Sequence, residues 1–310
     1  MKKAALSTAV LTALVSAPSF AATVYDNEGT TLKVGGRAEA RFNVSDKHEK
    51  DGNSSFKDKS RARVNLKGKS QISDDLYGFG KYEAEFDDSS DITNRYFFAG
   101  LGTSIGEFSY GKQDSAQVML TDITDTMATF GAEAADIVSG NKDKRENNFL
   151  YSGEFDALTI KANFIASDAK DKDSFGLAGL YNFGAFDIGA GYVSQSNGDN
   201  DDDQFNLVGQ YSMDAFTLGA LFTIGTIADD DYTGYELSAI YKPMKNLSLV
   251  GVYNFQEVDP KAGSKEDTVD EFAIEAVYKF NGHLRTYAGY KFQQIDSGDD
   301  ELQAGIRYDF

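Results

Sequence analysis

The sequence predicts an all-β fold, a 16-stranded antiparallel transmembrane β-barrel with its third long loop folded inward. Three observations support this prediction: an N-terminal export signal, apolar and polar residues that alternate through most of the chain, and connections that are alternately very short and long. Successive side chains of a β-strand point to opposite faces, so alternation with a period of two is typical of a strand between two different environments.

The N-terminal segment has the three parts of a secretory signal peptide, in order. Lys2 and Lys3 are basic, residues 4–17 are apolar and uncharged, and Ser19-Phe20-Ala21 supplies the small residues of a cleavage site. Cleavage after Ala21 predicts a signal peptide at 1–21 and a barrel domain at 22–310. The alternative is a buried N-terminal helix, which this order of parts disfavours.

Composition excludes several other classes of protein. The chain has 310 residues, no Cys, 49 acidic and 30 basic side chains, and a net charge of −19. The absence of Cys excludes a disulfide framework, a thiolate metal site and a cysteine nucleophile. The acidic balance argues against a nucleic-acid partner, because binding to phosphates requires basic surface.

The alternating runs are about ten residues long, which is the length of a tilted transmembrane strand. In one run, Leu158, Ile160 and Ala162 alternate with Thr159 and Lys161. A secreted β-sandwich would alternate too, but closure of a large sheet removes its exposed edges, and aromatic pairs at the predicted turns favour a membrane girdle. The sixteen strands are expected to start near Thr31, Lys59, Leu76, Asn94, Glu107, Glu146, Leu158, Ser174, Phe186, Gln204, Thr217, Thr233, Leu247, Val269, Leu284 and Glu301.

Two kinds of connection join these strands. Short turns lie between aromatic residues, as at 183–186 and 280–283. Longer acidic loops include those expected at 196–203, 228–231, 258–268 and 296–300, and the eight long loops together carry almost all of the negative charge. An acidic rim concentrates cations, so we expect a modest preference for cations that weakens as salt rises.

Charged residues share one face of the first three predicted strands. A charged side chain in contact with lipid at mid-bilayer costs about 2–4 kcal/mol, so this face is expected to line the lumen. A charged lumen holds water, and a 16-stranded barrel with such a lumen encloses a channel. The basic residues of this face include Arg37, Arg61, Arg63, Lys67, Lys69 and Lys81, with Glu39, Glu83 and Glu85 among them.

One connection, between Gln113 and Arg145, is much longer than the others. It contains a helix-compatible stretch at 119–128 and apolar residues that are unusual in an exposed loop. We therefore expect it to fold into the lumen, the alternative being a mobile surface loop. Its acidic residues include Asp114, Asp122, Asp125, Glu133 and Asp136.

The chain resembles the trimeric general diffusion porins of Gram-negative outer membranes, especially the acidic vibrio-type members. The residues that carry the resemblance span the mature chain: ATVYDNEGTTLKVGGRAEARF, RARVNLKGKSQISDDLYGFGKYEAEF, NRYFFAGL, DTMATFGAE, KRENNFLYSG and the terminal GIRYDF. The alternating aromatics of the last segment, Tyr308 and Phe310, resemble the signal read by the barrel assembly machinery.

The resemblance implies a constriction where the acids of the third loop face a basic wall. By motif, Arg37, Arg63, Arg95 and Arg145 match the wall, to which Arg61 and Lys81 are added, and Asp125 and Glu133 match the loop acids. The chain departs from the family at the loop tip, where Ala128-Thr129 replaces the usual Pro-Glu. The second long loop, which latches a neighbouring subunit in the family, is short here, at 87–93.

We therefore expect an outer-membrane homotrimer for passive diffusion of small hydrophilic solutes and ions, in contact with lipid and lipopolysaccharide and without a cofactor. The alternative is a substrate-selective porin for sugars or anions, for which the sequence shows no Trp and no evident aromatic track. An enzyme is disfavoured, because His48 and His283 lack partners for a catalytic triad at plausible spacing. No metal site is predicted; the weak candidate is Asp199, Asp201 and Asp203.

Overall fold

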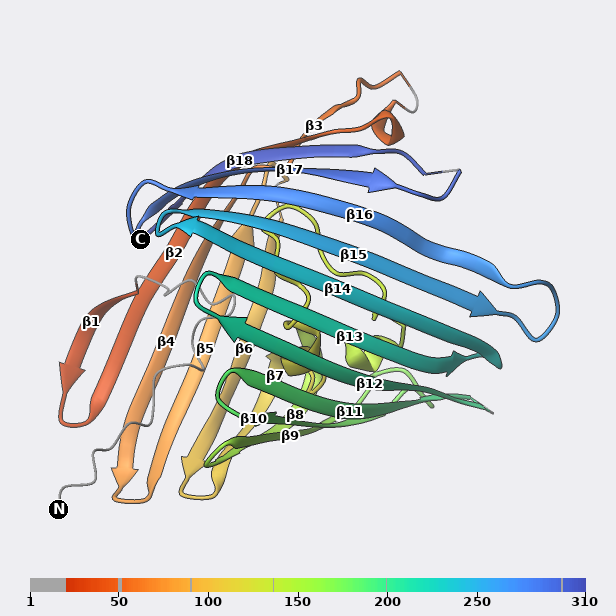
Figure 1. Cartoon of the computed structure of the whole chain (residues 1–310). Helices are drawn as coiled ribbons and strands as arrows, with labels where there is room; N and C mark the ends of the chain where they lie inside the picture. Colours follow the sequence, from red (N-terminus) through yellow and green to blue (C-terminus); the bar gives the residue numbers. More distant parts are fainter. Residues whose placement is uncertain (1–20, 50–51, 90, 136, 199, 297) are drawn as a thin grey trace, which may run out of the picture.

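The computed structural model describes residues 21–49, 52–89, 91–135, 137–198, 200–296 and 298–310. Its strands form one antiparallel sheet that curves around a central lumen (Figure 1). The predicted signal peptide, apart from Ala21, lies outside the described residues. The strands are β1 (Ala22–Asn27), β2 (Thr30–Val44), β3 (Phe56–Asp58), β4 (Arg61–Ser73), β5 (Leu76–Phe86), β6 (Ile92–Thr103), β7 (Gly106–Gln113), β8 (Arg145–Phe155), β9 (Leu158–Ile165), β10 (Ser174–Asn182), β11 (Phe186–Asn197), β12 (Asn200–Met213), β13 (Phe216–Ile227), β14 (Asp230–Met244), β15 (Leu247–Asp259), β16 (Glu266–Lys279), β17 (Leu284–Gln293) and β18 (Glu301–Asp309).

The barrel closes where β18 pairs with β2, from Leu302 opposite Val44 to Asp309 opposite Arg37. Two of the 18 strands are accessory segments: β1 pairs with the first residues of β2, and β3 with its last residues. The closed barrel therefore has 16 strands, which confirms the predicted fold class. The prediction omitted β1 and β3, which are too short to show the alternation of a spanning strand.

The barrel has its apolar residues outside and its polar residues inside. Phe97 is 67% exposed on the outer surface, whereas Gln204, Asn206 and Glu236 are fully buried inside. Lipid covers the outer side chains of such a barrel, so their exposure has no cost there. Among the described residues, no helix is sufficiently long and apolar to cross a membrane.

The predicted acidic loops at 196–203 and 228–231 are largely strand, which corrects those two boundaries. Pairing continues to Asn197 opposite Asn200, and to Ile227 opposite Asp230, so each connection is a tight hairpin. These strands extend beyond the band of apolar side chains that faces lipid, which we call the apolar belt. Beyond this belt both faces of a strand meet water. The alternation of apolar and polar residues then disappears although the backbone hydrogen bonds continue.

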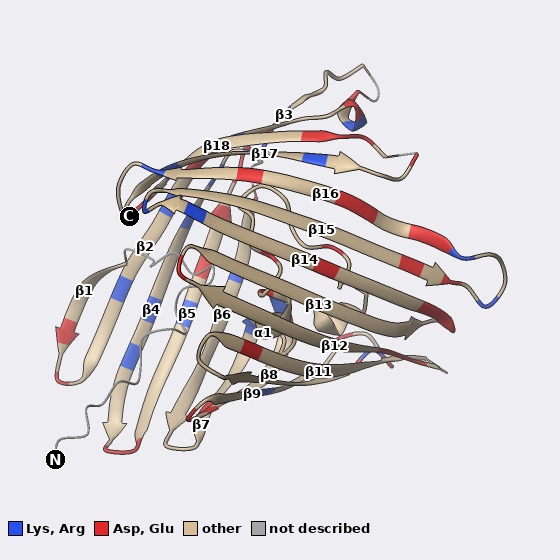
Figure 2. Cartoon of the chain, in the orientation of Figure 1, with Lys and Arg blue, Asp and Glu red and all other residues tan. Residues whose placement is uncertain are grey.

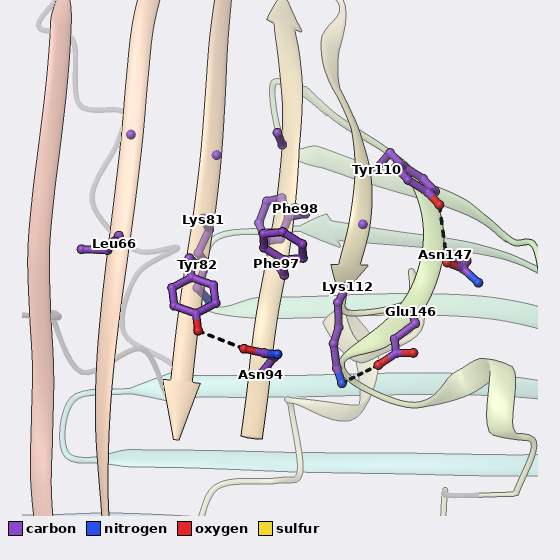
Figure 3. A pocket seen from close by; sticks show the side chains of 14 residues that line it. Leu66, Lys81, Tyr82, Asn94, Phe97, Phe98, Tyr110, Lys112, Glu146 and Asn147 are labelled. Atoms are coloured by element: carbon purple, nitrogen blue, oxygen red, sulfur yellow. Dashed lines mark hydrogen bonds and ion pairs between the residues drawn. The ribbon is translucent and has the colours of Figure 1, made fainter. Parts of the chain in front are cut away.

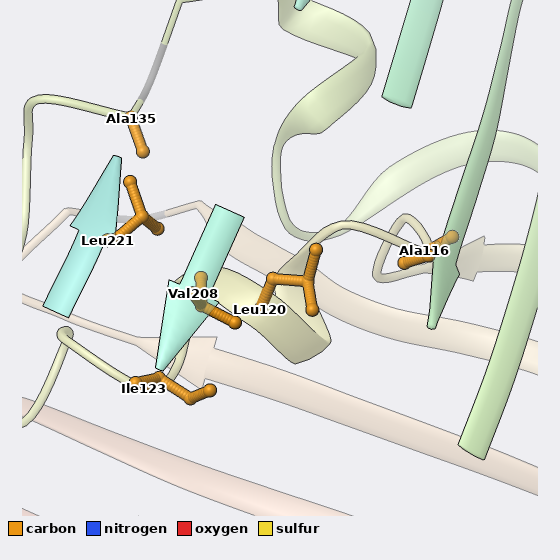
Figure 4. Packing of buried hydrophobic residues seen from close by; sticks show 7 residues of the cluster. Ala116, Leu120, Ile123, Ala135, Val208 and Leu221 are labelled. Atoms are coloured by element: carbon orange, nitrogen blue, oxygen red, sulfur yellow. The ribbon is translucent and has the colours of Figure 1, made fainter. Parts of the chain in front are cut away.

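The long connection at residues 114–144 enters the barrel, as the fold prediction expects. Its helix α1 covers only Val118–Thr121, shorter than the predicted 119–128. Leu120 is fully buried in a cluster with Ala116, Ile123 and Ala135 of the connection and with Val208 and Leu221 of the barrel wall (Figure 4). We call residues 114–144 the inward loop. Short 3-10 segments, η1 (Asp46–His48) and η2 (Ser139–Asn141), complete the described helices.

Candidate functional site: the channel lumen

Carboxylates and amides on the barrel wall hold the inward loop in place. Glu236 on β14 accepts a hydrogen bond from the Thr124 hydroxyl and one of 2.9 Å from the amide of Ala135. Gln204 on β12 accepts from the amide of Val138 at 3.0 Å. The loop is far from these strands in sequence, and nothing in its local pattern identifies the wall residues that bind it.

Glu275 on β16 holds the loop tip, where the chain departs from the family pattern. Its carboxylate accepts hydrogen bonds from the amides of Ala128 and Thr129, at 3.0 and 2.7 Å. Gln303 on β18 donates to the carbonyl of Thr129 at 2.7 Å. The small residues Ala128 and Thr129 thus bring the tip close to the wall, and the carboxylate there belongs to the barrel instead of the loop.

Four of the predicted wall residues, Arg37, Arg61, Arg63 and Arg95, come together on β2, β4 and β6. They are paired with acids of the same wall. The ion pairs are Arg37–Glu39 at 3.7 Å, Arg61–Glu39 at 2.6 Å, Arg61–Glu85 at 3.7 Å, Arg63–Glu83 at 3.9 Å, Arg63–Glu85, Arg95–Glu83 at 2.9 Å and Arg95–Glu85 at 3.6 Å. Three carboxylates therefore offset most of the charge of four guanidinium groups, and we call these seven residues the arginine network.

Lys81 and Arg145 lie outside the arginine network. The Nζ of Lys81 is 3.3 Å from the ring centroid of Tyr96, whose hydroxyl donates to Asp114 at 3.0 Å. Lys81 thus lies beside the start of the inward loop. Arg145 opens β8 opposite Gln113, and its buried Nε has no hydrogen-bond partner among the described residues.

The predicted loop acids are divided between two places. Asp114, Asp122 and Asp125 line a cavity of about 290 Å³ between the loop and Tyr96. Enclosure by the barrel, with the negative charges of Asp114 and Asp125, raises the pKa of Asp122 to about 7. Its side chain is nevertheless exposed to lumenal water.

Glu133 lies apart from these three acids. It lines a second cavity with Lys47, Glu271, Lys291 and Glu301. Its side chain is exposed to lumenal water, but enclosure by the barrel raises the pKa of its carboxyl. Lys291 forms ion pairs of 2.8 Å with Glu271 and 3.3 Å with Glu301. Glu133 therefore lies in a different part of the lumen from Asp114, Asp122 and Asp125. Asp136 lies outside the described residues.

A closed barrel with a charged lumen and a loop docked inside has close relatives. A sequence model of the family described as Gram-negative porin matches residues 7–298. The chain belongs to the Gram-negative porin family. It is 35% identical over 350 residues to porin-like protein L of Photobacterium profundum and 36% identical over 384 residues to outer membrane protein U of Vibrio cholerae, with 100% of both chains covered in each case.

Solved structures support the fold of this porin. OmpF of Salmonella typhi superposes with a TM-score of 0.83 at 20% identity, covering 92% of this chain and 99% of OmpF. A loop-deletion variant of OmpT of Vibrio cholerae gives a TM-score of 0.77 at 20% identity, covering 91% and 100%. Family membership and the sequence relatives, rather than these structures, show that the chain is an outer-membrane channel protein and that it is not an enzyme.

The weak metal candidate of this porin lies in a different setting from the one expected. Asp201 and Asp203 are on strand β12, paired with Ser196 and Ser194, and Asp199 lies outside the described residues. In a strand they are not free to converge on one cation as residues of a loop could. Within the described ranges, no group of three His, Cys, Asp or Glu side chains is arranged to hold a metal ion.

The predicted assembly signal lies at the seam of the barrel. The amide of Phe310 donates to the carbonyl of Gly36 at 3.0 Å, and the amide of Gly36 donates back at 2.8 Å. Tyr308 points outward and its ring stacks on His283 with centroids 6.0 Å apart. These contacts make the C-terminal residues part of the strand pairing that closes the barrel.

Proposed function

We propose that this porin is a passive diffusion channel for small hydrophilic solutes and ions, with a modest preference for cations. The observation that carries the proposal is the inward loop, which is docked across a water-accessible lumen lined by charged groups. Its carboxylates, Asp114, Asp122 and Asp125, would form one side of the constriction. The other side would be the wall of Arg37, Arg61, Arg63, Lys81, Arg95 and Arg145.

Two features support the cation preference. The arginine network is nearly balanced by its own carboxylates, so this wall repels cations much less than its guanidinium groups alone would. Acidic side chains also gather on the strand ends at the mouth formed by the longer connections, as on β14 and β16 (Figure 2). A negative mouth raises the local concentration of cations, and salt screens this effect.

Ion selectivity in a planar bilayer tests the proposal. The full-length mature chain is reconstituted, and its reversal potential is measured across a KCl gradient at low and at high salt. We expect a reversal potential of the cation-selective sign that decreases at high salt. Absence of conductance would refute the channel, and preference for anions at low salt would refute the cation selectivity alone.

We also propose that the porin assembles as a homotrimer. A solved structure of OmpT of Vibrio cholerae is described as a trimer form. The exposed apolar belt would be covered by neighbouring subunits, outer-membrane lipid and lipopolysaccharide, and Tyr308 with Phe310 would be the assembly signal. Light scattering of the detergent-extracted protein should give the mass of three chains, and a monomeric mass would contradict the trimer.

A second candidate function is selectivity for particular organic solutes. It is favoured by one observation that the sequence analysis missed: aromatic rings gather on the lumenal face of β5 and β6. The sequence already contains this signal. Tyr77, Phe79 and Lys81 occupy every second position of one strand, so their side chains lie on the same face.

A further inference from the structure

Four aromatic side chains form a continuous strip on the lumenal wall. Tyr77 and Phe79 come from β5, and Phe98 and Tyr96 from β6. The ring centroids are 6.1 Å apart for Tyr77 and Phe79, 6.5 Å for Phe79 and Phe98, and 6.5 Å for Phe98 and Tyr96. These spacings are those of interacting rings. We call these four residues the aromatic strip.

The rings of the aromatic strip face the lumen. Tyr96 donates its hydroxyl hydrogen to Asp114 of the inward loop, which lies inside the barrel. Figure 3 shows the alternation on the same strands: Tyr82 and Phe97 project on the near side, and Lys81 and Phe98 lie behind the ribbons. Phe97 is 67% exposed on the lipid side, so Phe98, the next residue, points inward.

Two glycines on β6 allow the rings of β5 to lie against the wall. Gly100 is opposite Phe79 in the sheet, and Gly102 is opposite Tyr77. A methyl group added at Gly100 would be 2.7 Å from Cζ of Phe79, and one at Gly102 would be 2.0 Å from Cζ of Tyr77. Each ring therefore rests directly on a glycine, and its opposite face is directed to the lumen.

Lysine side chains lie at both ends of the aromatic strip. The Nζ of Lys69 is 3.6 Å from the ring centroid of Tyr77, and the Nζ of Lys81 is 3.3 Å from that of Tyr96. The two rings between them, Phe79 and Phe98, have no polar atoms in their side chains. Among the described residues, neither Lys69 nor Lys81 forms an ion pair within 4.0 Å, so both ammonium groups have capacity for an anion.

We propose that the aromatic strip is a solute subsite for aromatic carboxylates. Phe79 and Phe98 are inclined at 78° to each other, so the solute ring would stack on the face of one and meet the edge of the other. Its carboxylate would pair with the ammonium group of Lys69 or Lys81. Neutral sugars carry no charge to pair with the lysines, small aliphatic acids have no flat apolar face for the rings, and organic cations have no group that pairs with an ammonium. The proposal rests on the proposed diffusion function, since the subsite would lie along the path of permeating solutes.

Channel block by benzoate tests the subsite. Single-channel conductance in KCl is measured with benzoate, acetate or cyclohexanecarboxylate added from each side of the bilayer. We expect benzoate to lower the conductance at the lowest concentration, because only benzoate combines the charge with a flat ring. Phe79→Leu should raise the half-blocking concentration of benzoate about fivefold, since it removes one ring contact. Lys69→Gln should raise it about threefold, because it removes an ammonium group that pairs with the carboxylate.

Phe97→Leu is the matched control, because it removes an aromatic ring from the lipid side of the same strand. It should leave benzoate block unchanged. Equilibrium dialysis of radiolabelled benzoate against the detergent-solubilised protein separates the two proposals. Saturable binding that Phe79→Leu weakens supports the subsite even if no conductance is found, which would refute the diffusion function only. Equal block by benzoate and acetate, or block that Phe79→Leu leaves unchanged, would overturn the subsite.

Discussion

Truncation of Leu120 should release the inward loop without unfolding the barrel. Leu120 is fully buried, and its side chain lies over two glycines of β11: a methyl group added at Gly189 or Gly191 would come within 2.7 or 2.8 Å of its δ carbons. The glycines have no side chains that could move into the space left by Leu120→Ala. The substitution should therefore cost about 3–5 kcal/mol, the upper part of the usual range for such a change.

This cost should fall on the docking of the loop, because the contacts of Leu120 are with the loop and with the wall it rests on. At 1.4 kcal/mol per factor of ten, the open state of the loop should become roughly 100- to 4,000-fold more populated. Hydrogen–deuterium exchange, followed by mass spectrometry on peptides covering 116–125, measures this population. More frequent current fluctuations should accompany the faster exchange.

Two further variants separate loop release from general damage. Leu120→Met keeps the volume and should change exchange by less than about tenfold. Leu101→Ala truncates a leucine of β6 that is 48% exposed on the lipid side, and it should leave exchange of the loop unchanged. Unaltered loop exchange in Leu120→Ala, or a lower melting temperature of the barrel with normal loop exchange, would refute the reasoning.

Three other predictions concern charge and the loop tip. Glu85→Gln removes a carboxylate that pairs with Arg63. A negative charge beside a water-filled path attracts cations and repels anions, so the cation-to-anion permeability ratio should fall roughly severalfold. An unchanged reversal potential would contradict this. Because the pKa of Asp122 is raised to about 7, lowering the pH from 8 to 5 should protonate its carboxylate and reduce cation selectivity. Asp122→Asn should show the reduced cation selectivity at both pH values. An equal pH response in the two proteins would exclude Asp122 as the titrating group. Glu275→Ala leaves two amides of the loop tip without their acceptor, at a cost of about 1–3 kcal/mol. Proteolysis near Thr129 should therefore be faster in Glu275→Ala than in Glu275→Gln. Equal rates in the two variants would show that the carboxylate does not hold the tip.

The strand pattern of this porin was predictable because the bilayer imposes it. Each spanning strand has one face toward lipid and one toward water, so apolar and polar residues must alternate, and a shift by one residue would place charges in lipid. All 16 barrel strands begin within a few residues of their predicted starts. The prediction failed where this constraint ends, as at Asn200–Asp203 of β12, which pairs beyond the apolar belt.

The lumenal contacts were only partly predictable, because they depend on barrel closure. The alternation of side chains between the two faces of each strand placed Arg61, Arg63 and Lys81 on the lumenal wall. It did not show that Glu39, Glu83 and Glu85 are close enough to offset the guanidinium groups, since those distances depend on the register between strands.

By itself, the sequence determined the barrel, the number of its strands and the face of each strand that meets water, because these follow from local alternation against lipid. Only the tertiary structure decided how the lumen is built. Glu236 meets Thr124 across 112 residues of sequence, and Tyr77 and Phe98 join one aromatic strip through strands paired in a particular register. Such contacts arise from closure of the sheet around the inward loop, and no local periodicity encodes them.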